Sequence, residues 1–245
     1  MKCFFSIMII LLSINPLLAQ EEEMVTELKQ AVFNDFVATS AGSSGMLSSA
    51  TYAATESDQY LAEGSIFLND EFLDVEVFGN KGEVFKSKGK YNIQADELQY
   101  FDTQKNIKAI KADKIQGFAI NNKIFVSKME ADSSYAFYEI LAHGNIQLLI
   151  KHKIILTEIN NNPVLGTTSA AGSTTGKIKA TASEKIYYAT DITLDKLPKS
   201  KKKLLKLMGD YESDIAKTIK EKDLNIKAKK DLIAIFRLYN ELSNQ

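Results

Sequence analysis

The sequence predicts an α+β protein, in which an antiparallel β-meander sheet, open or barrel-like, is followed by a small C-terminal helical unit. Between residues 64 and 159, apolar residues recur with a period of two, as in strands that bury one face. Turn signals such as Asn69-Asp70 and Asn121-Asn122 separate these segments at close intervals. From Ser200 onward the apolar period becomes helical. Helical segments do not alternate with the strands, which disfavours a doubly wound parallel sheet.

The first nineteen residues have the pattern of a secretory signal peptide. Lys2 precedes an apolar run, Asn15-Pro16 interrupts it, and Leu17-Leu18-Ala19 offers a cleavage site before Gln20. A membrane anchor is disfavoured, because a spanning helix needs about 20 consecutive apolar residues. The single cysteine, Cys3, precedes the apolar run, so we expect no lipid attachment there. These features predict an exported protein, periplasmic, outer-membrane-associated or extracellular, with no transmembrane segment after cleavage.

Composition disfavours nucleic acid as a partner. The formal net charge is −1 over 245 residues, and loss of the positive charge of Lys2 with the leader changes it to −2. The basic side chains are almost all lysine, and Arg237 is the single arginine, although arginine is the usual bidentate ligand of phosphate. An envelope protein, a glycan or a lipid stays open as a partner, and composition does not set the oligomeric state. The mature chain has no cysteine and therefore depends on its core rather than on disulfides.

The segment after the leader, residues 20–59, is predicted to be a flexible lead with a short helix. Met24, Leu28 and Val32 are spaced by about one helical turn. The stretch 38–55 is dominated by Ala, Ser, Gly and Thr, which bury too little apolar surface to offset the entropy of ordering them.

Residues 60–198 are predicted to form the antiparallel β-rich domain. A loop is expected near 160–176, where three asparagines and Pro163 precede a run of small residues. After that loop, residues 177–180 and 185–189 read as one more hairpin, and Pro198 ends the domain.

The C-terminal unit, residues 199–245, is predicted to contain about three helices. Ser200 is placed as the N-cap of the first helix, and Gly209 is placed for a left-handed stop at its C-terminal end. Apolar residues at helical spacing mark the buried side of each helix, namely Leu204, Leu205, Met208, Ile215, Ile219, Leu232, Ile235, Phe236 and Tyr239.

Tests for catalytic, cofactor and metal motifs give no match, so we expect no catalytic residue, no cofactor and no metal. The stretch 172–177 resembles a phosphate loop but lacks its first glycine and its Ser or Thr after the lysine. The stretch 42–46 lacks the second glycine of a nucleophile elbow. His143 is interpreted as a turn residue and His152 as a solvated strand end. An acidic patch lacks the spacing of a calcium loop and comprises Asn69, Asp70, Glu71, Asp74 and Glu76.

Two sets of residues are candidates for an interaction surface. The first is the lysine cluster at the start of the helical unit, whose charge could attract anionic lipid or polyanions, although such runs are often only a solvated helix face: Lys199, Lys201, Lys202 and Lys203. The second is a pair of strand tyrosines, Tyr91 and Tyr100, which could line an exposed sheet face, although tyrosine in strands is often half-buried packing.

Segments between residues 60 and 242 also carry a resemblance to known proteins. They are 64–72, 90–93, 96–100, 138–141, 148–149, 202–205, 231–233 and 239–240. In these segments the chain resembles a group of uncharacterised exported β-rich proteins of Gram-negative bacteria that have a C-terminal helical tail. The group has no assigned activity, so the resemblance implies the compartment and the fold and assigns no site residue.

The sequence therefore favours a non-enzymatic exported interaction or scaffold protein of the bacterial envelope. Two alternatives stay open. One is a periplasmic or outer-membrane carrier of a lipid or glycan, which requires an apolar cavity. The other is an uncharacterised hydrolase, which requires converging Asp, Glu or His side chains.

Overall fold

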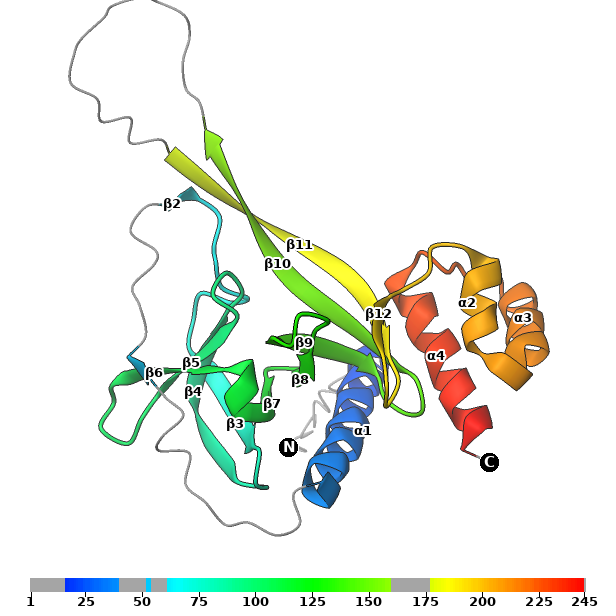
Figure 1. Ribbon diagram of the computed structural model, residues 1–245, viewed down its shortest axis with the longest axis horizontal. Helices are drawn as coiled ribbons and strands as arrows, with labels where there is room; N and C mark the ends of the chain where they lie inside the picture. Colours follow the sequence, from blue (N-terminus) through cyan, green and yellow to red (C-terminus); the bar gives the residue numbers. More distant parts are fainter. Residues whose placement is uncertain (1–15, 40–51, 54–60, 160–176, 245) are drawn as a thin grey trace, which may run out of the picture.

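The computed structural model describes residues 16–39, 52–53, 61–159 and 177–244 (Figure 1). Its centre is an open sheet of ten antiparallel strands, which confirms the predicted fold class. The strands are β3 Leu73–Gly79, β4 Val84–Asn92, β5 Glu97–Phe101, β6 Ile107–Lys111, β7 Ile115–Ile120, β8 Lys123–Met129, β9 Tyr135–Ala142, β10 Gln147–Ile159, β11 Lys177–Ala189 and β12 Leu194–Lys196. Two short strands add to it: β1 Tyr52–Ala53 pairs with β6, and β2 Leu61–Glu63 runs parallel to β11.

One connection departs from a simple meander and curls the sheet. The strand order is β6-β5-β4-β3-β7, so β7 pairs with β3 although it follows β6 in the chain. In a flat sheet β6 and β7 would lie four strand spacings apart, about 19 Å. A single 3₁₀ turn, Ala112–Lys114, joins them and spans only about 8 Å. The first five strands must therefore curl around their shared core.

Aromatic side chains fill that curled part of the sheet. Tyr91, Phe118, Phe125 and Phe137 are all at most 1% exposed, and their ring centroids lie 4.7–5.9 Å apart. Such offset and edge-on contacts add to the free energy gained by burying the rings. Strands β7, β8 and β9 also bury their opposite face, which packs against α1.

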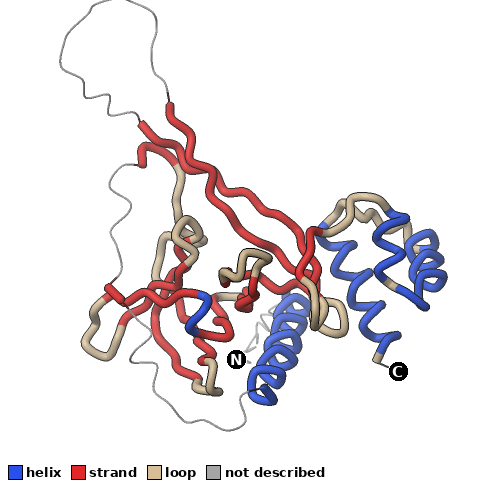
Figure 2. The backbone as a smooth tube through the Cα atoms, viewed as in Figure 1, coloured by secondary structure: helices blue, strands red, loops and turns tan. Residues whose placement is uncertain are grey.

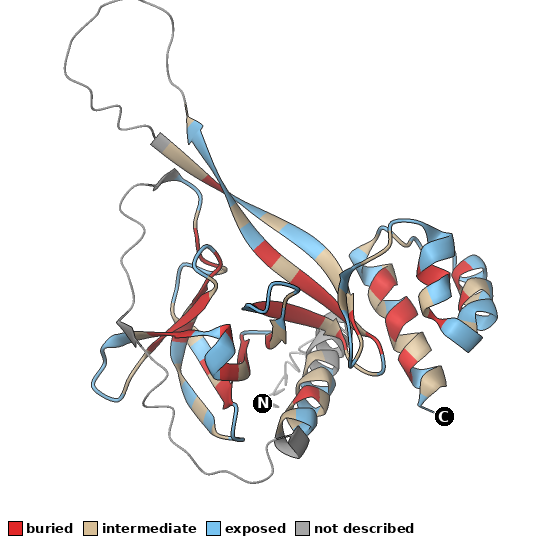
Figure 3. Cartoon of the chain, viewed as in Figure 1, coloured by how far each residue is buried: buried red, intermediate tan, exposed pale blue. Residues whose placement is uncertain are grey.

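Strands β10 and β11 form a long arm that projects from the sheet (Figure 1). They pair over thirteen residues, from Gln147 opposite Ala189 to Ile159 opposite Lys177. The two short segments predicted at 177–180 and 185–189 are thus one continuous strand. The intervening residues are small and polar because most of the outer half of the arm is solvated (Figure 3). The predicted loop at 160–176 lies outside the described residues.

An N-terminal helix, α1 Pro16–Thr39, packs against the sheet. Val32 is 2% exposed, and the rings of Phe33 and Phe36 contact that of Phe78 at 5.7 and 5.3 Å. The short helix expected within residues 20–59 is thus present, and it is longer than predicted and buries its apolar side on the sheet. The helix begins at Pro16, ahead of the predicted cleavage site, while the predicted leader residues 1–15 and the spacer residues 40–51 and 54–60 lie outside the described residues.

Replacement of Val32 by alanine tests this packing. We expect the free energy of unfolding to fall by about 2 kcal/mol, since two buried methyl groups are lost at about 0.8 kcal/mol each and a cavity remains. Urea unfolding of the chain from residue 20 would measure it, with Gln30→Ala on the exposed side of the same helix as control. Equal stability of the two variants would contradict burial of α1.

The helical unit consists of α2 Lys201–Leu207, α3 Glu212–Glu221 and α4 Lys229–Ser243, as predicted, and forms a group beside the base of the arm (Figure 2). Ser200 caps α2 by accepting a hydrogen bond from the Lys203 amide at 3.3 Å. Gly209 ends it with a positive φ of 52°. The buried helix residues pack together and against three sheet residues, Ala142, Ile146 and Leu148. The unit therefore shares a core with the sheet.

A buried asparagine fixes α4 to the turn between β9 and β10. Asn240 is 4% exposed, and its side-chain amide donates to the carbonyl oxygens of His143 and Ile146, both at 3.0 Å. Its Oδ1 accepts from the Ile146 amide at 3.1 Å. A Cβ on Gly144 would lie 2.4 Å from the Asn240 side chain, which explains glycine at that position. We call this contact the Asn240 clamp.

Candidate functional site

Lys199, one of the predicted interaction residues, lines a groove where the sheet meets the helical unit. Three lysines from other segments line the same groove: Lys185 on β11, Lys196 on β12 and Lys227 before α4. All four side chains are exposed. We call this hollow, of about 570 Å³, the lysine groove.

The remaining lining of the lysine groove is mostly apolar. It consists of Ile186, Leu197, Pro198, Ile226 and Leu232, of which Leu232 is buried and the others are half-buried. Glu184 is the one acidic residue of the lining, and it accepts a hydrogen bond from Lys229 Nζ at 2.7 Å. The groove thus combines apolar walls with an excess of positive charge.

Two hydrogen bonds hold the groove walls in place. The Leu197 amide donates to the carbonyl oxygen of Ile186 at 3.0 Å, which ties the segment after β12 to β11. On the other wall, Asp231 accepts from the Asn225 amide at 2.8 Å and fixes the connection between α3 and α4. Because both walls are anchored, the groove is a formed feature of the fold.

The other predicted lysines, Lys201, Lys202 and Lys203, are exposed on the first turn of α2 and do not line the groove. Together with Lys196, Lys199 and Lys206 they belong to residues 196–209, a stretch with six lysines and no acid. Positive charge at the start of a helix is opposed by the helix dipole, and lysines one turn apart repel each other. We call Lys201, Lys202 and Lys203 the basic turn.

The two predicted tyrosines lie inside the sheet instead of on its surface. Tyr91 is 1% exposed and its hydroxyl donates to Asp96 Oδ1 at 2.6 Å, while Tyr100 is 8% exposed and stacks near Phe85. The idea of an exposed tyrosine platform is therefore wrong for this pair. The curl of the sheet encloses the face on which they lie, and the sequence pattern alone does not indicate which face is enclosed.

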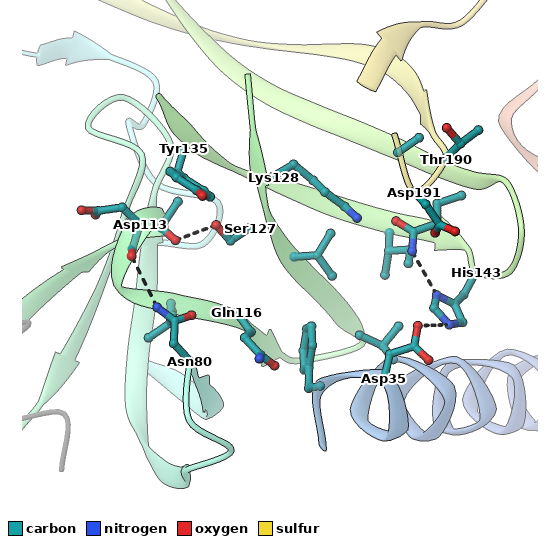
Figure 4. Close-up of a pocket in the computed structure, with 18 of the residues that line it drawn as sticks. Asp35, Asn80, Asp113, Gln116, Ser127, Lys128, Tyr135, His143, Thr190 and Asp191 are labelled. Carbon is teal, nitrogen blue, oxygen red and sulfur yellow. Dashed lines mark hydrogen bonds and ion pairs between the residues drawn. The ribbon is translucent and has the colours of Figure 1, made fainter. Parts of the chain in front are cut away.

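A second hollow of about 740 Å³ lies between α1 and the sheet (Figure 4). We call it the helix cavity. Its polar lining includes Asp35 from α1, Lys128 from β8, His143 from the turn after β9, and Asp191 from the turn before β12. Figure 4 shows Lys128 pointing into the cavity and Asp35 facing His143.

His143 joins α1 to the sheet in this cavity. Its Nε2 lies 3.0 Å from Asp35 Oδ2, and its Nδ1 lies 3.4 Å from the side-chain nitrogen of Gln147. Burial lowers the pKa of His143 despite the opposing effect of Asp35, so the ring is neutral near pH 7 and donates to Asp35. His143 does lie in a turn, as predicted, but its side chain makes a tertiary contact.

Lys128 is the cation of this lining, and Ser127 supplies one of its hydroxyls. Burial lowers the pKa of Lys128, while the charges of Asp191 and Asp35 oppose that shift. Ser127 donates from its hydroxyl to the carbonyl oxygen of Ala112 at 2.6 Å, an interaction that fixes the 3₁₀ turn and directs this hydroxyl away from His143. The arrangement can bind a polar molecule.

His152 is buried, forms a hydrogen-bonded row with Glu139 and Lys123, and is not a solvated strand end. It is 8% exposed, and its Nε2 lies 2.6 Å from Glu139 Oε2. The other Glu139 oxygen accepts from Lys123 Nζ at 2.6 Å. Strand alternation turns Lys151 and Lys153 to the opposite face from His152, so flanking charges do not indicate that a strand residue is exposed.

Two acids of the patch near residue 70 are paired with lysines. Asp74 pairs with Lys88 at 2.9 Å, and Glu76 pairs with both Lys86 and Lys29. Across the described residues, His, Cys, Asp and Glu form no group of three or more that could hold a metal ion. The rejected phosphate-loop and nucleophile-elbow motifs fall almost entirely outside the described part of the chain.

Comparison with known proteins gives no relative. No protein-family model, no curated protein and no solved structure matches the chain. Among the described helices, none has the length and apolar character needed to cross a membrane.

Proposed function

We propose that this protein is a non-enzymatic exported interaction protein of the bacterial envelope, and that it binds an anionic lipid surface through the basic turn. The observation that carries the proposal is the acid-free stretch 196–209 with its six lysines, three of them exposed on the first turn of α2. The charges on the first turn of α2 oppose the helix dipole, and Lys202 and Lys203 each lie one turn from Lys206, so folding alone does not favour them there.

The export pattern of the first nineteen residues and the resemblance to exported Gram-negative proteins support the envelope as the place of action. An anionic membrane surface attracts each nearby lysine by about 1 kcal/mol. Lysine suits this role, because it is a point charge on a flexible stem and needs no fixed geometry in its partner.

Vesicle flotation of the chain from residue 20 tests the proposal. We expect binding to phosphatidylcholine vesicles that contain phosphatidylglycerol, weak binding to vesicles without it, and loss of binding as salt is raised. The variant Lys201→Glu/Lys202→Glu/Lys203→Glu should bind on the order of 100-fold more weakly, since three contributions of about 1 kcal/mol are lost.

The matched control makes the same change of net charge at three other exposed lysines, namely Lys217 and Lys220 on α3 and Lys222 directly after it. If the control variant loses as much vesicle binding as the basic-turn variant, the net charge of the protein, and not the basic turn, determines its binding to the membrane. The proposal then fails. Unchanged binding of the basic-turn variant would also overturn it.

A further inference from the structure

We propose that the lysine groove is a binding site for a long-chain fatty acid. The acyl chain would lie along the apolar walls and the carboxylate among the four lysines of the lining, which we call the rim lysines. This inference rests on the proposed function in one respect, that the ligand is a component of the membrane to which the protein binds. The two roles can be tested apart, because none of the rim lysines belongs to the basic turn. The rim lysines are Lys185, Lys196, Lys199 and Lys227.

The walls of the groove have the chemistry of an acyl site. Four apolar residues of the walls are only half-buried. They come from two different parts of the fold and line one hollow: Ile186, Leu197, Pro198 and Ile226. A hollow of about 570 Å³ falls within the usual size of small-ligand sites. A polyanion such as a sugar phosphate would leave these apolar walls unused, whereas an acyl chain would cover them.

The rim supplies the charge complement for one carboxylate. Four lysines line the groove, and its single acid, Glu184, is already engaged by Lys229. The ligand should therefore be an anion. Its head should also be compact, because the four rim residues are lysines, which act as point charges, and planar bidentate recognition of phosphate usually uses arginine.

The rim lysines reach the groove from three separate segments. Lys185 lies on β11, Lys196 and Lys199 flank the end of β12, and Lys227 lies before α4. Their stems can pack along the apolar walls while their ammonium groups stay in water.

Isothermal titration calorimetry with dodecanoate, below its micellar concentration, tests the site on the chain from residue 20. We expect saturable binding of dodecanoate, about fourfold weaker binding for each methylene removed from the chain, and no binding of acetate. Dodecanol, which has the same chain without the charge, should bind at least about tenfold more weakly than dodecanoate, the effect of a lost ion pair of ordinary strength.

Variants locate the site. Lys196→Glu/Lys199→Glu should lower dodecanoate affinity by about tenfold or more, whereas Lys217→Glu/Lys220→Glu on α3 should leave it unchanged. Thermal unfolding of each variant checks that it folds. Any one of three results would overturn the inference. They are an affinity that does not depend on chain length, equal binding of dodecanol and dodecanoate, and equal dodecanoate affinity of the rim and control variants.

The same variants distinguish this inference from the proposed function. Loss of vesicle binding in the basic-turn variant with retained dodecanoate binding supports both. If the basic-turn variant binds vesicles as the wild-type chain does while dodecanoate binding depends on the rim lysines, that result contradicts the proposed function and supports the fatty-acid site. The reverse pattern sinks only the fatty-acid site.

Discussion

Replacement of Asn240 by alanine is expected to destabilise the protein by about 4 kcal/mol, because three backbone groups of the β9–β10 turn lose their buried partner at about 1–3 kcal/mol each and water restores part of the loss. For a chain of this size that corresponds to a fall in Tm of about 10 °C. The lost free energy is that of the contact between α4 and the sheet. Differential scanning calorimetry of the chain from residue 20 would measure it.

The neighbouring Asn145 provides the control for the Asn240 clamp. Its side chain donates to Ser243 Oγ at 3.0 Å from an exposed position, so Asn145→Ala should cost less than about 1 kcal/mol. Asn240→Asp should cost at least as much as Asn240→Ala, because a carboxylate oxygen would face the carbonyl oxygens of His143 and Ile146 at a buried position. Similar stabilities of the Asn240→Ala and Asn145→Ala variants would show that the clamp is not a main link.

Replacement of Glu139 by alanine is expected to cost about 2–3 kcal/mol, since the buried His152 loses its hydrogen-bond partner, whereas Lys123, with a side chain that is 37% exposed, can regain water. Glu139 is 6% exposed, and its two oxygens contact His152 and Lys123. Glu139→Gln keeps the shape and an acceptor oxygen and should cost less. Urea unfolding at pH 7 would rank the wild-type chain and the two variants.

The charge of Glu139 also predicts a dependence on pH. Burial by itself raises the pKa of this carboxyl, but the hydrogen bond from His152 and the charge of Lys123 outweigh burial and hold the pKa below its ordinary value of 4.5. A carboxyl whose pKa is lower in the folded chain stabilises the fold above its unfolded pKa, and this contribution is lost as the pH falls through the folded pKa.

We therefore expect the stability difference between the wild-type chain and Glu139→Gln to be largest near pH 7 and to shrink below about pH 4.5. Unfolding free energies measured at several pH values would show this convergence. A difference that stays constant down to pH 3 would mean that the Glu139 charge does not stabilise the folded state.

Local signals in the sequence predicted most elements of the fold. Period-two segments became strands, and Ser200 and Gly209 marked the two ends of α2. The pairing of β7 with β3 could not be predicted, because periodicity shows which side of a strand is buried and not which strand lies beside it. The linker Ala112–Lys114 is too short to cross a flat sheet, but this indicates a curled sheet only when the pairing of β7 with β3 is already known.

The candidate site was only partly predictable for a similar reason. Lys199 stood out because its neighbours in the chain are also lysines, whereas Lys185, Lys196 and Lys227 come from three segments that meet only in the folded chain. The alternation of Ile150, Lys151, His152 and Lys153 along β10 could have indicated that His152 is buried.

The linker between β6 and β7 has a consequence for the order of folding. The pairs β3–β4, β4–β5 and β5–β6 each join neighbours in the chain through short turns, so their loops close at low entropic cost. Pairing of β3 with β7 brings together residues at least 36 apart, such as Gly79 and Ile115, and Ala112–Lys114 can reach that position only after the preceding hairpins have formed. We therefore expect closure of this pair to follow formation of the hairpins, and the aromatic core stays exposed to water until it closes.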